Sequence, residues 1–250
     1  MINVVFHVLG MIAGITLIAW RFRRAGERTG VRFYLGFIVL IGIGVAGTRF
    51  LYVLSDVSYY AANWREVFSL EATIIQGALL FGFPAVVGLA YLWRMPFWRL
   101  ADLVVPGLAL GQAIGRIGCL AYGCCYGLPV HLPHLATGVT WTYPTQTMHA
   151  LANLLTMAIL LALDRPRTKP FDGFLTLMYA LLFSTQRYLI DLLRATGAVF
   201  AADMPFAGVR VAQVFSIATI IVALILLLWK WHRARRHTGT GEQIAGDPQA

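Results

Sequence analysis

Long apolar runs separated by short polar segments dominate the hydrophobic pattern of the chain. Six of these runs reach about 18 residues or more, the length that crosses a bilayer as a helix, and another is slightly shorter. In chain order they cover residues 2–20, 33–55, 70–93, 100–122, 147–163, 173–194 and 211–229. This pattern predicts an all-α integral membrane protein with seven transmembrane helices. We expect one membrane domain over residues 1–236 and a polar, disordered tail over residues 237–250.

Composition agrees with a membrane location and excludes a soluble domain. Hydrophobic residues make up 59% of the 250 residues and charged residues 12%, whereas soluble proteins carry about a quarter charged residues. A net charge of +9 would suggest nucleic-acid binding in a soluble protein. Here, 14 of the 20 Lys and Arg fall in alternate loops, within residues 21–32, 94–99, 165–169 and 230–236. This asymmetry predicts an N-terminus outside the cell and a cytoplasmic C-terminus.

Four arginines lie inside the predicted spans, namely Arg49, Arg116, Arg187 and Arg194. A charged residue within a membrane helix costs about 3 kcal/mol, so such residues usually mark functional sites. Snorkelling to the membrane surface is the alternative for Arg49 and Arg194, which are close to span ends. Arg187, Asp191 and Arg194 share one face of a helix. Because guanidinium groups prefer phosphate or carboxylate, we predict a site for a lipid phosphate in the outer half of the membrane.

Three cysteines, Cys119, Cys124 and Cys125, occur within seven residues at the end of the fourth span. Three interpretations remain open: small packing residues, a disulfide, or a metal site together with His131 and His134. Adjacent cysteines differ from the CxxC spacing of common zinc sites. We therefore expect neither a metal nor another cofactor.

Three of the predicted spans also contain glycines or polar residues that can mediate helix packing or bind a ligand. Gly107, Gly111 and Gly115 are spaced four residues apart, which allows another helix to approach closely. His149 opens the fifth span and can titrate there, and Gln76 lies within the third span, where it can hydrogen-bond to a helix or a ligand.

Four stretches resemble signature segments of the prolipoprotein diacylglyceryl transferases of bacterial inner membranes. Residues 115–127 (GRIGCLAYGCCYG) are similar to the family signature, and residues 47–52 (GTRFLY) to an element of the second span. Residues 143–149 (YPTQTMH) and 187–194 (RYLIDLLR) are similar to two further family elements. The order of the elements, the number of spans and the orientation also agree, so the resemblance covers nearly the whole chain.

The resemblance implies a reaction, its partners and its location. A transferase of this family moves the diacylglyceryl group of phosphatidylglycerol to the lipobox cysteine thiol of a preprolipoprotein, which gives a thioether and glycerol-1-phosphate. The implied partners are phosphatidylglycerol, the preprolipoprotein signal peptide and membrane lipids, and no nucleic acid. The implied location is the bacterial inner membrane, crossed several times.

The resemblance also implies site residues. Arg116 and Arg187 match the essential arginines of the family, and if a base is needed, His149 and Cys124 are candidates. The implied substrate-binding residues are Arg49, Tyr52, Gln76, Gly118, Cys119, Gly127, Gln146, Asp191 and Arg194. A histidine of the family corresponds to Gln76, which cannot accept a proton from a thiol, and its signature asparagine and glutamate correspond to Cys119 and Cys124. Two alternatives stay open: a thiol or redox enzyme that uses the three cysteines, and a non-catalytic protein that binds lipid or signal peptides.

Overall fold

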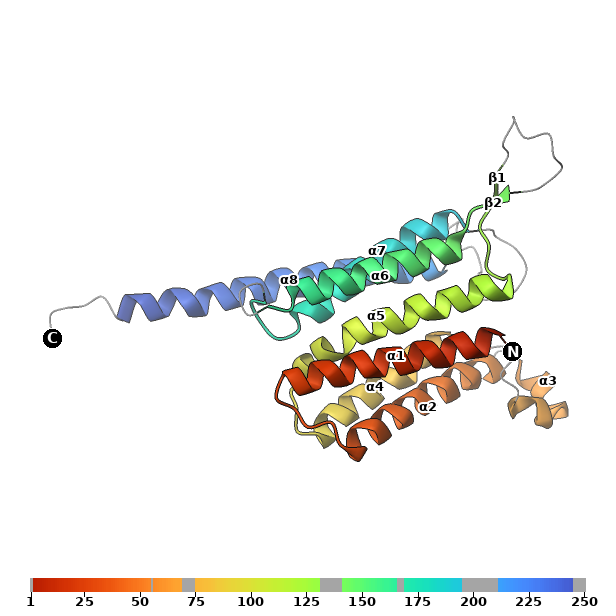
Figure 1. Cartoon of the computed structure of the whole chain (residues 1–250), viewed down its shortest axis with the longest axis horizontal. Coiled ribbons are helices and arrows are strands. Elements are labelled where there is room, and N and C mark those ends of the chain that lie inside the picture. Colours follow the sequence, from red (N-terminus) through yellow and green to blue (C-terminus); the bar gives the residue numbers. More distant parts are fainter. Residues whose placement is uncertain are drawn as a thin grey trace. The chain divides into compact units, whose positions relative to one another are not determined.

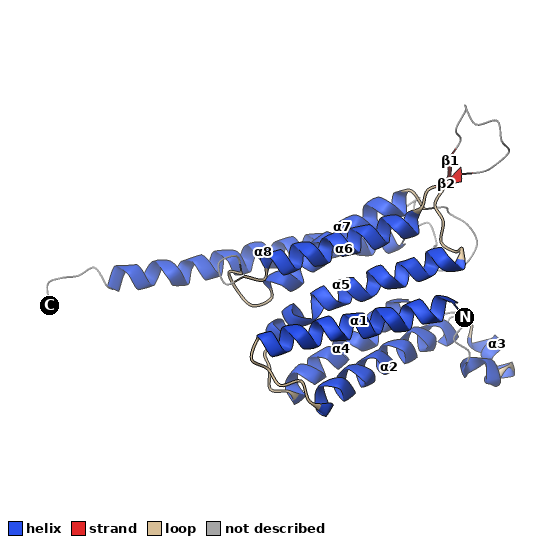
Figure 2. Cartoon of the chain, in the orientation of Figure 1, coloured by secondary structure: helices blue, strands red, loops and turns tan. Residues whose placement is uncertain are grey.

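Helices make up nearly all of the regular structure in the computed structural model (Figure 1 and Figure 2). It describes residues 2–54, 56–68, 75–130, 141–165, 169–194 and 211–244. The long helices are α1 (Ile2–Arg24), α2 (Val31–Leu54), α4 (Ile75–Leu92), α5 (Phe97–Tyr122), α6 (Thr145–Leu163), α7 (Phe174–Leu192) and α8 (Val211–Ile244). The shorter elements are α3 (Val57–Ala62), the 3₁₀ helix η1 (Trp64–Phe68) and an antiparallel pair of strands, β1 (Pro129–Val130) and β2 (Trp141–Thr142). The predicted all-α class is confirmed, with this one strand pair added.

Five helices within the described part of the chain are long and apolar enough to cross a membrane, namely α1, α2, α5, α6 and α8. They coincide with five of the seven predicted spans. The other two predicted spans correspond to α4, in which the apolar helix Leu80–Leu92 is shorter, and to α7, which carries polar side chains such as Gln186, Arg187 and Asp191.

The last helix differs most from its predicted bounds. The apolar run ends at Trp229 and the sequence predicts a disordered tail from His237, but α8 continues to Ile244. Residues 230–244 contain no proline, and one lysine and three arginines there favour the helical conformation. Residues 245–250 lie outside the described part of the chain.

Two compact units divide the chain. Unit 1 comprises Met1–Ile18 and Ala101–Ala250, and unit 2 comprises Ala19–Leu100. In unit 2, a cluster of aromatic rings joins the end of α1 to α2 and α4. The ring of Trp93 stacks on Phe33 with centroids 5.9 Å apart, and Phe37 packs against the same tryptophan at 6.0 Å.

In unit 1, glycines allow the first part of α1 to pack tightly against α5. A Cβ atom added to Gly10 would lie 2.7 Å from the carbonyl oxygen of Gly111, and one added to Gly14 would lie 2.7 Å from that of Gly107. Side chains at these positions would push the helices apart. The close helix approach predicted from the glycine spacing is therefore confirmed at Gly107 and Gly111.

A buried carboxylate, Asp102, ties the start of α5 to the start of α7 within unit 1. Its Oδ2 accepts a hydrogen bond from the backbone N–H of Gly173 at 2.8 Å and lies 3.0 Å from Nζ of Lys169. Its Oδ1 accepts from the backbone N–H of Thr176 at 2.9 Å and from the Thr176 hydroxyl at 2.7 Å. The carboxylate thus satisfies free N–H groups at a helix N-terminus and compensates the helix dipole.

We expect Asp102→Ala to lower the free energy of unfolding by about 3 kcal/mol, because it removes the buried partner of a lysine and of two backbone N–H groups. The midpoint of denaturant unfolding in detergent micelles measures this loss. The matched control is Asp172→Ala, which removes a carboxylate 3.4 Å from the same lysine but 56% exposed. The control should change stability by less than about 1 kcal/mol. Equal midpoints for the two variants would show that Asp102 does not hold these helices together.

Candidate active site

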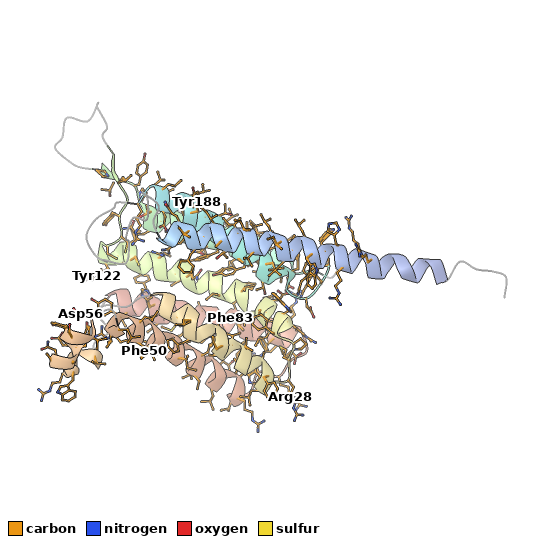
Figure 3. The ribbon with its side chains drawn as sticks, turned by 180° about the vertical axis from the view of Figure 1, so that it is seen from behind. Arg28, Phe50, Asp56, Phe83, Tyr122 and Tyr188 are labelled. Carbon is orange, nitrogen blue, oxygen red and sulfur yellow. The ribbon has the colours of Figure 1, made fainter. Side chains whose placement is uncertain are left out.

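Helix α5 ends in a turn that leads into the cysteine cluster, directly after Tyr122 (Figure 3). The backbone N–H of Gly123 donates to the carbonyl oxygen of Leu120 at 3.1 Å, and that of Cys124 donates to the carbonyl oxygen of Cys119 at 3.2 Å. These two bonds form a Schellman cap, which requires a left-handed residue, and Gly123 meets this requirement with a φ of 76°. The cap folds the chain back so that Cys124 comes next to Cys119.

The segment after this turn is bonded to the start of α6 and to the end of α7. The backbone N–H of Gly127 donates to the carbonyl oxygen of Tyr143 at 2.9 Å, and that of Leu128 donates to the carbonyl oxygen of Leu193 at 2.8 Å. Gly127 also forms an isolated antiparallel bridge with Arg194. Backbone hydrogen bonds therefore hold the ends of α5, α6 and α7 together at one end of unit 1.

Gly127 has no room for a side chain at this junction. A Cβ atom added there would lie 2.6 Å from the carbonyl oxygen of Leu193 and 2.7 Å from Cβ of Tyr143. We expect Gly127→Ala to destabilise the protein by about 1–3 kcal/mol, because backbone atoms must move to accept the methyl group. Thermal unfolding in detergent measures the effect, with Gly44→Ala as the control, since a Cβ there meets nothing within 4 Å. If both variants unfold at the wild-type temperature, the tight packing around Gly127 is not present in solution.

Two buried side chains at the start of α6 support the cysteine turn. The hydroxyl of Thr145 donates to the carbonyl oxygen of Cys125 at 2.6 Å, and Nε2 of Gln146 donates to that of Cys124. These bonds hold Cys125 at a φ of 66°, which is uncommon for a residue other than glycine. Gln146, a predicted substrate-binding residue, is 0% exposed, and its Oε1 has no hydrogen-bond partner within the described part of the chain. That oxygen can accept a hydrogen bond from a ligand.

The sulfur atoms of Cys119, Cys124 and Cys125 converge in this turn. All three lie within 4.8 Å of one another, and the Sγ atoms of Cys124 and Cys125 are 3.2 Å apart. All three are free thiols. Hydrogen bonds from Cys119 and Cys124, together with the positive charges of Arg194 and Arg116, lower the pKa of Cys125 to about 5, although burial opposes this shift. Burial raises the pKa of Cys124. The directions of these shifts favour a thiolate on Cys125 over one on Cys124, the cysteine named from the sequence as a candidate base.

Three arginines gather beside the cysteines. Nε of Arg187 lies 3.2 Å from Oδ2 of Asp191, and a guanidinium nitrogen of Arg194 lies 3.9 Å from Oδ1 of the same carboxylate. The pairing of Asp191 with Arg187 and Arg194 is therefore confirmed, although Arg194 lies two residues beyond the end of α7 at Leu192. Arg116, from α5, lies close enough to Arg187 and Arg194 to interact with them electrostatically. Asp191 thus pairs with two of the three guanidinium groups, which leaves an excess of positive charge suited to an anion.

His149 joins this arginine cluster from α6. Its side chain is 5% exposed and interacts electrostatically with Arg116, Arg187 and Arg194. Ten of the predicted site residues belong to unit 1, namely Arg116, Gly118, Cys119, Cys124, Gly127, Gln146, His149, Arg187, Asp191 and Arg194. His131 and His134, considered as metal ligands from the sequence, lie outside the described part of the chain.

The sequence did not lead us to Asn153 and Gln186, two polar residues that hydrogen bonds connect to His149. Nδ2 of Asn153 donates to the carbonyl oxygen of His149 at 2.8 Å, and Oδ1 of Asn153 accepts from Nε2 of Gln186 at 2.9 Å. These contacts join α6 to α7 below the arginine cluster. A signal was present in the sequence, because Gln146, His149, Asn153 and Thr156 recur every three or four residues and so share one face of α6.

Three predicted site residues, Arg49, Tyr52 and Gln76, belong to unit 2, whereas the arginine cluster lies in unit 1. Arg49 is 7% exposed. Its Nε donates to the carbonyl oxygen of Val67 at 2.8 Å, and Nη2 donates to that of Glu66. The guanidinium also lies 5.4 Å from the ring centroid of Tyr52. Within unit 2, Arg49 and Tyr52 therefore support the 3₁₀ helix η1, and Gln76 lies in the first turn of α4.

We expect Arg49→Ala to speed amide hydrogen exchange in residues 64–68 by at least about tenfold, because charge-assisted hydrogen bonds contribute about 1.5–3 kcal/mol each. Hydrogen exchange followed by mass spectrometry measures this change. The control is Arg65→Ala, which removes an exposed arginine that stacks on Trp64. Unchanged exchange in the Arg49 variant would mean that this arginine is free to serve another role.

Comparisons with known proteins agree with the sequence resemblance. A model of the family described as prolipoprotein diacylglyceryl transferase matches residues 4–229. The phosphatidylglycerol–prolipoprotein diacylglyceryl transferase of Dehalococcoides mccartyi is 30% identical, over 93% of this chain and 90% of that protein. The proteins of the same name from Clostridium tetani and Trichormus variabilis are 28% and 30% identical, over 87% and 90% of this chain and 88% and 83% of their own lengths. The chain therefore belongs to the prolipoprotein diacylglyceryl transferase family.

Proposed function

We propose that the protein transfers the diacylglyceryl group of phosphatidylglycerol to the lipobox cysteine of a prolipoprotein. The observation that carries this proposal is the gathering of Arg116, Arg187 and Arg194, of which only Arg187 and Arg194 pair with the carboxylate of Asp191. Phosphatidylglycerol presents one negative phosphodiester, which guanidinium groups bind by charge-assisted hydrogen bonds. The names of the relatives, which specify phosphatidylglycerol and prolipoprotein, support the same substrates.

The reaction explains why several arginines are useful. The acceptor sulfur attacks the glyceryl carbon that carries the phosphate, an S–C bond forms, and the C–O bond to the phosphate breaks. The phosphodiester carries one negative charge, and the departing phosphate monoester gains a second. Guanidinium groups fixed in place before the reaction stabilise this developing charge more than the charge of the bound lipid, and this difference lowers the barrier.

The acceptor thiol must also lose its proton, because the thiolate is the nucleophile. Gln76 stands at the position of the family's histidine and has no basic nitrogen. Among the side chains beside the arginines, His149 and Cys125 are the proton acceptors that we propose. Oε1 of Gln146, which can accept one more hydrogen bond, is suited to a backbone N–H of the peptide substrate.

In this proposal α4 and α7 complete a set of seven spans in a bacterial inner membrane. The distribution of lysines and arginines supports an outside N-terminus and a cytoplasmic C-terminus. The arginine cluster then belongs to the outer ends of α5, α6 and α7, and the Asp102–Lys169 pair to the cytoplasmic ends. This orientation suits a signal peptide that has already inserted into the membrane.

The purified protein in vesicles that contain phosphatidylglycerol and a synthetic lipobox peptide tests the proposal. We expect release of glycerol-1-phosphate that depends on the peptide. Two controls isolate the reaction: vesicles of phosphatidylcholine alone, and a peptide in which the acceptor cysteine is serine. Equal release with the serine peptide would indicate a lipid hydrolase, and no release by a folded protein would contradict the proposed transfer.

A further inference from the structure

Hydrogen bonds from several segments fix the backbone around Cys119, Cys124 and Cys125. A Schellman cap brings Cys124 to Cys119, and bonds from Thr145 and Gln146 fix the backbone of Cys125 and Cys124. Three soft ligand atoms therefore converge on one point from a seven-residue segment. In the described part of the chain, these residues form the group of three metal-ligand side chains that lie close enough to hold one ion.

We propose that Cys119, Cys124 and Cys125 bind a zinc ion whose fourth coordination position takes the acceptor thiol of the prolipoprotein. This inference rests on the proposed transfer and names the group that activates its nucleophile. It replaces the sequence-based expectation of no metal, because the sequence did not reveal that the three sulfur atoms converge. Zinc in catalytic sites is held by three protein ligands and keeps its fourth position for water or substrate.

The distances between the sulfur atoms suit zinc. Zinc–sulfur bonds of about 2.3 Å in a tetrahedral arrangement place sulfur atoms about 3.8 Å apart. In the structure the Sγ atoms of Cys124 and Cys125 are 3.2 Å apart, and no pair among the three exceeds 4.8 Å. Side-chain movements of about 1 Å or less would complete the site, while the hydrogen bonds from α6 hold the backbone.

The charges around the cluster also suit this ion. Three thiolates and one Zn²⁺ ion carry a net charge of −1, and a bound substrate thiolate would bring it to −2. Arg116 interacts electrostatically with Cys119 and Cys125, and Arg194 with Cys125. These guanidinium groups compensate the negative charge of the cluster. They also place the phosphate of the lipid donor close to the sulfur that attacks it.

Zinc would supply the step that Gln76 cannot perform. Coordination to zinc deprotonates a thiol outright, so the acceptor S–H loses its proton as the Zn–S bond forms. The zinc-bound thiolate then attacks the glyceryl carbon, the C–O bond breaks, and its electron pair leaves with the phosphate. The released proton ends on the phosphate monoester or in solvent. Zinc keeps its charge throughout, so neither an oxidant nor a reductant is required.

Metal binding is tested first, without reference to activity. The full-length protein is purified in detergent with a thiol reductant, incubated with Zn²⁺ and dialysed, and its metal content is measured. We expect about one zinc ion per wild-type chain, and loss of this zinc in Cys119→Ser, Cys124→Ser and Cys125→Ser. Arg187→Gln, which removes an arginine but no sulfur, should retain it. A wild-type protein that folds and binds no zinc overturns the proposal regardless of how the variants fold.

The open coordination position is tested with Co²⁺ in place of zinc. The wild-type protein should show a thiolate-to-cobalt charge-transfer absorption, and a lipobox peptide should shift it, whereas the peptide with serine at the acceptor position should not. Zinc loss in His131→Ala or His134→Ala would instead indicate a closed four-ligand site and overturn the catalytic role. No spectral shift with the cysteine peptide would overturn it as well.

Activity then separates the failure of this inference from that of the proposed function. We expect a chelator to abolish diacylglyceryl transfer and added Zn²⁺ to restore it. If the chelator-treated protein and the triple serine variant transfer at the wild-type rate, the zinc proposal is wrong and the proposed function stands. If the protein binds zinc but the peptide gains no lipid, the transfer is wrong, and with it the role of the zinc.

Discussion

The variant Arg116→Gln is expected to transfer the diacylglyceryl group with a kcat/KM about 10³-fold below that of the wild type. Arg116 lies among Arg187, Arg194, His149 and the cysteines, where the phosphate and the attacking sulfur meet in the proposed reaction. Glutamine keeps much of the side-chain length but lacks the charge that stabilises the second negative charge of the departing phosphate. Steady-state release of glycerol-1-phosphate from phosphatidylglycerol vesicles measures this effect.

Two matched variants make the Arg116 result interpretable. Arg116→Lys restores the charge without the planar fork of the guanidinium, so we expect it to recover part of the loss. Arg99→Gln removes an exposed arginine that pairs with Glu27 at 2.8 Å and should leave kcat/KM within about twofold of the wild type. A folded Arg116→Gln protein with wild-type kcat/KM would exclude this arginine from phosphate binding.

The variant Asp191→Ala should have the second largest effect, a decrease of about 10²-fold in kcat/KM. Its carboxylate is 2% exposed and pairs with Arg187 at 3.2 Å and with Arg194 at 3.9 Å. Without it, like charges repel and the two guanidinium groups lose their common anchor. Because Asp191 acts through the arginines, it is a positioning residue, and the loss should lie mainly in a higher KM for phosphatidylglycerol.

The split between KM and kcat distinguishes this positioning role from general destabilisation. Asp191→Glu keeps the charge on the same helix face and should recover most of the affinity for the lipid. Asp172→Ala, which removes a 56% exposed carboxylate near the other end of α7, should retain wild-type KM and kcat. A lower kcat with an unchanged KM in Asp191→Ala would mean that the carboxylate takes part in the chemical step instead.

Much of the fold and of the site could be predicted from local features of the sequence. Five long apolar runs were identified because the bilayer sets a minimum helix length. The pairing of Arg187 and Arg194 with Asp191 followed from spacings of four and three residues, although α7 ends at Leu192, before Arg194. The close packing at Gly107 and Gly111 followed from their spacing, since small residues allow two backbones to approach.

Other features depend on contacts between distant segments and could not be predicted in this way. The cysteine turn is completed by Thr145 and Gln146, about twenty residues further along the chain. The hydrogen bond from Gln186 to Asn153 joins α7 to α6. The polar residues on each helix do not indicate which other helix they contact. The sequence suggests that Arg49 binds a ligand. In the structure, however, its guanidinium donates hydrogen bonds to backbone carbonyl oxygens of η1.

The most direct test of the central claim is mass spectrometry of the acceptor peptide itself. A lipobox peptide is incubated with the purified protein and phosphatidylglycerol of defined acyl chains, and its intact mass and fragment ions are recorded. We expect a mass gain of one diacylglyceryl unit, located on the cysteine sulfur as a thioether, and only a small fraction of this gain with Arg116→Gln. An unmodified peptide after incubation with folded, zinc-loaded wild-type protein would contradict it, as would a modification on any other atom.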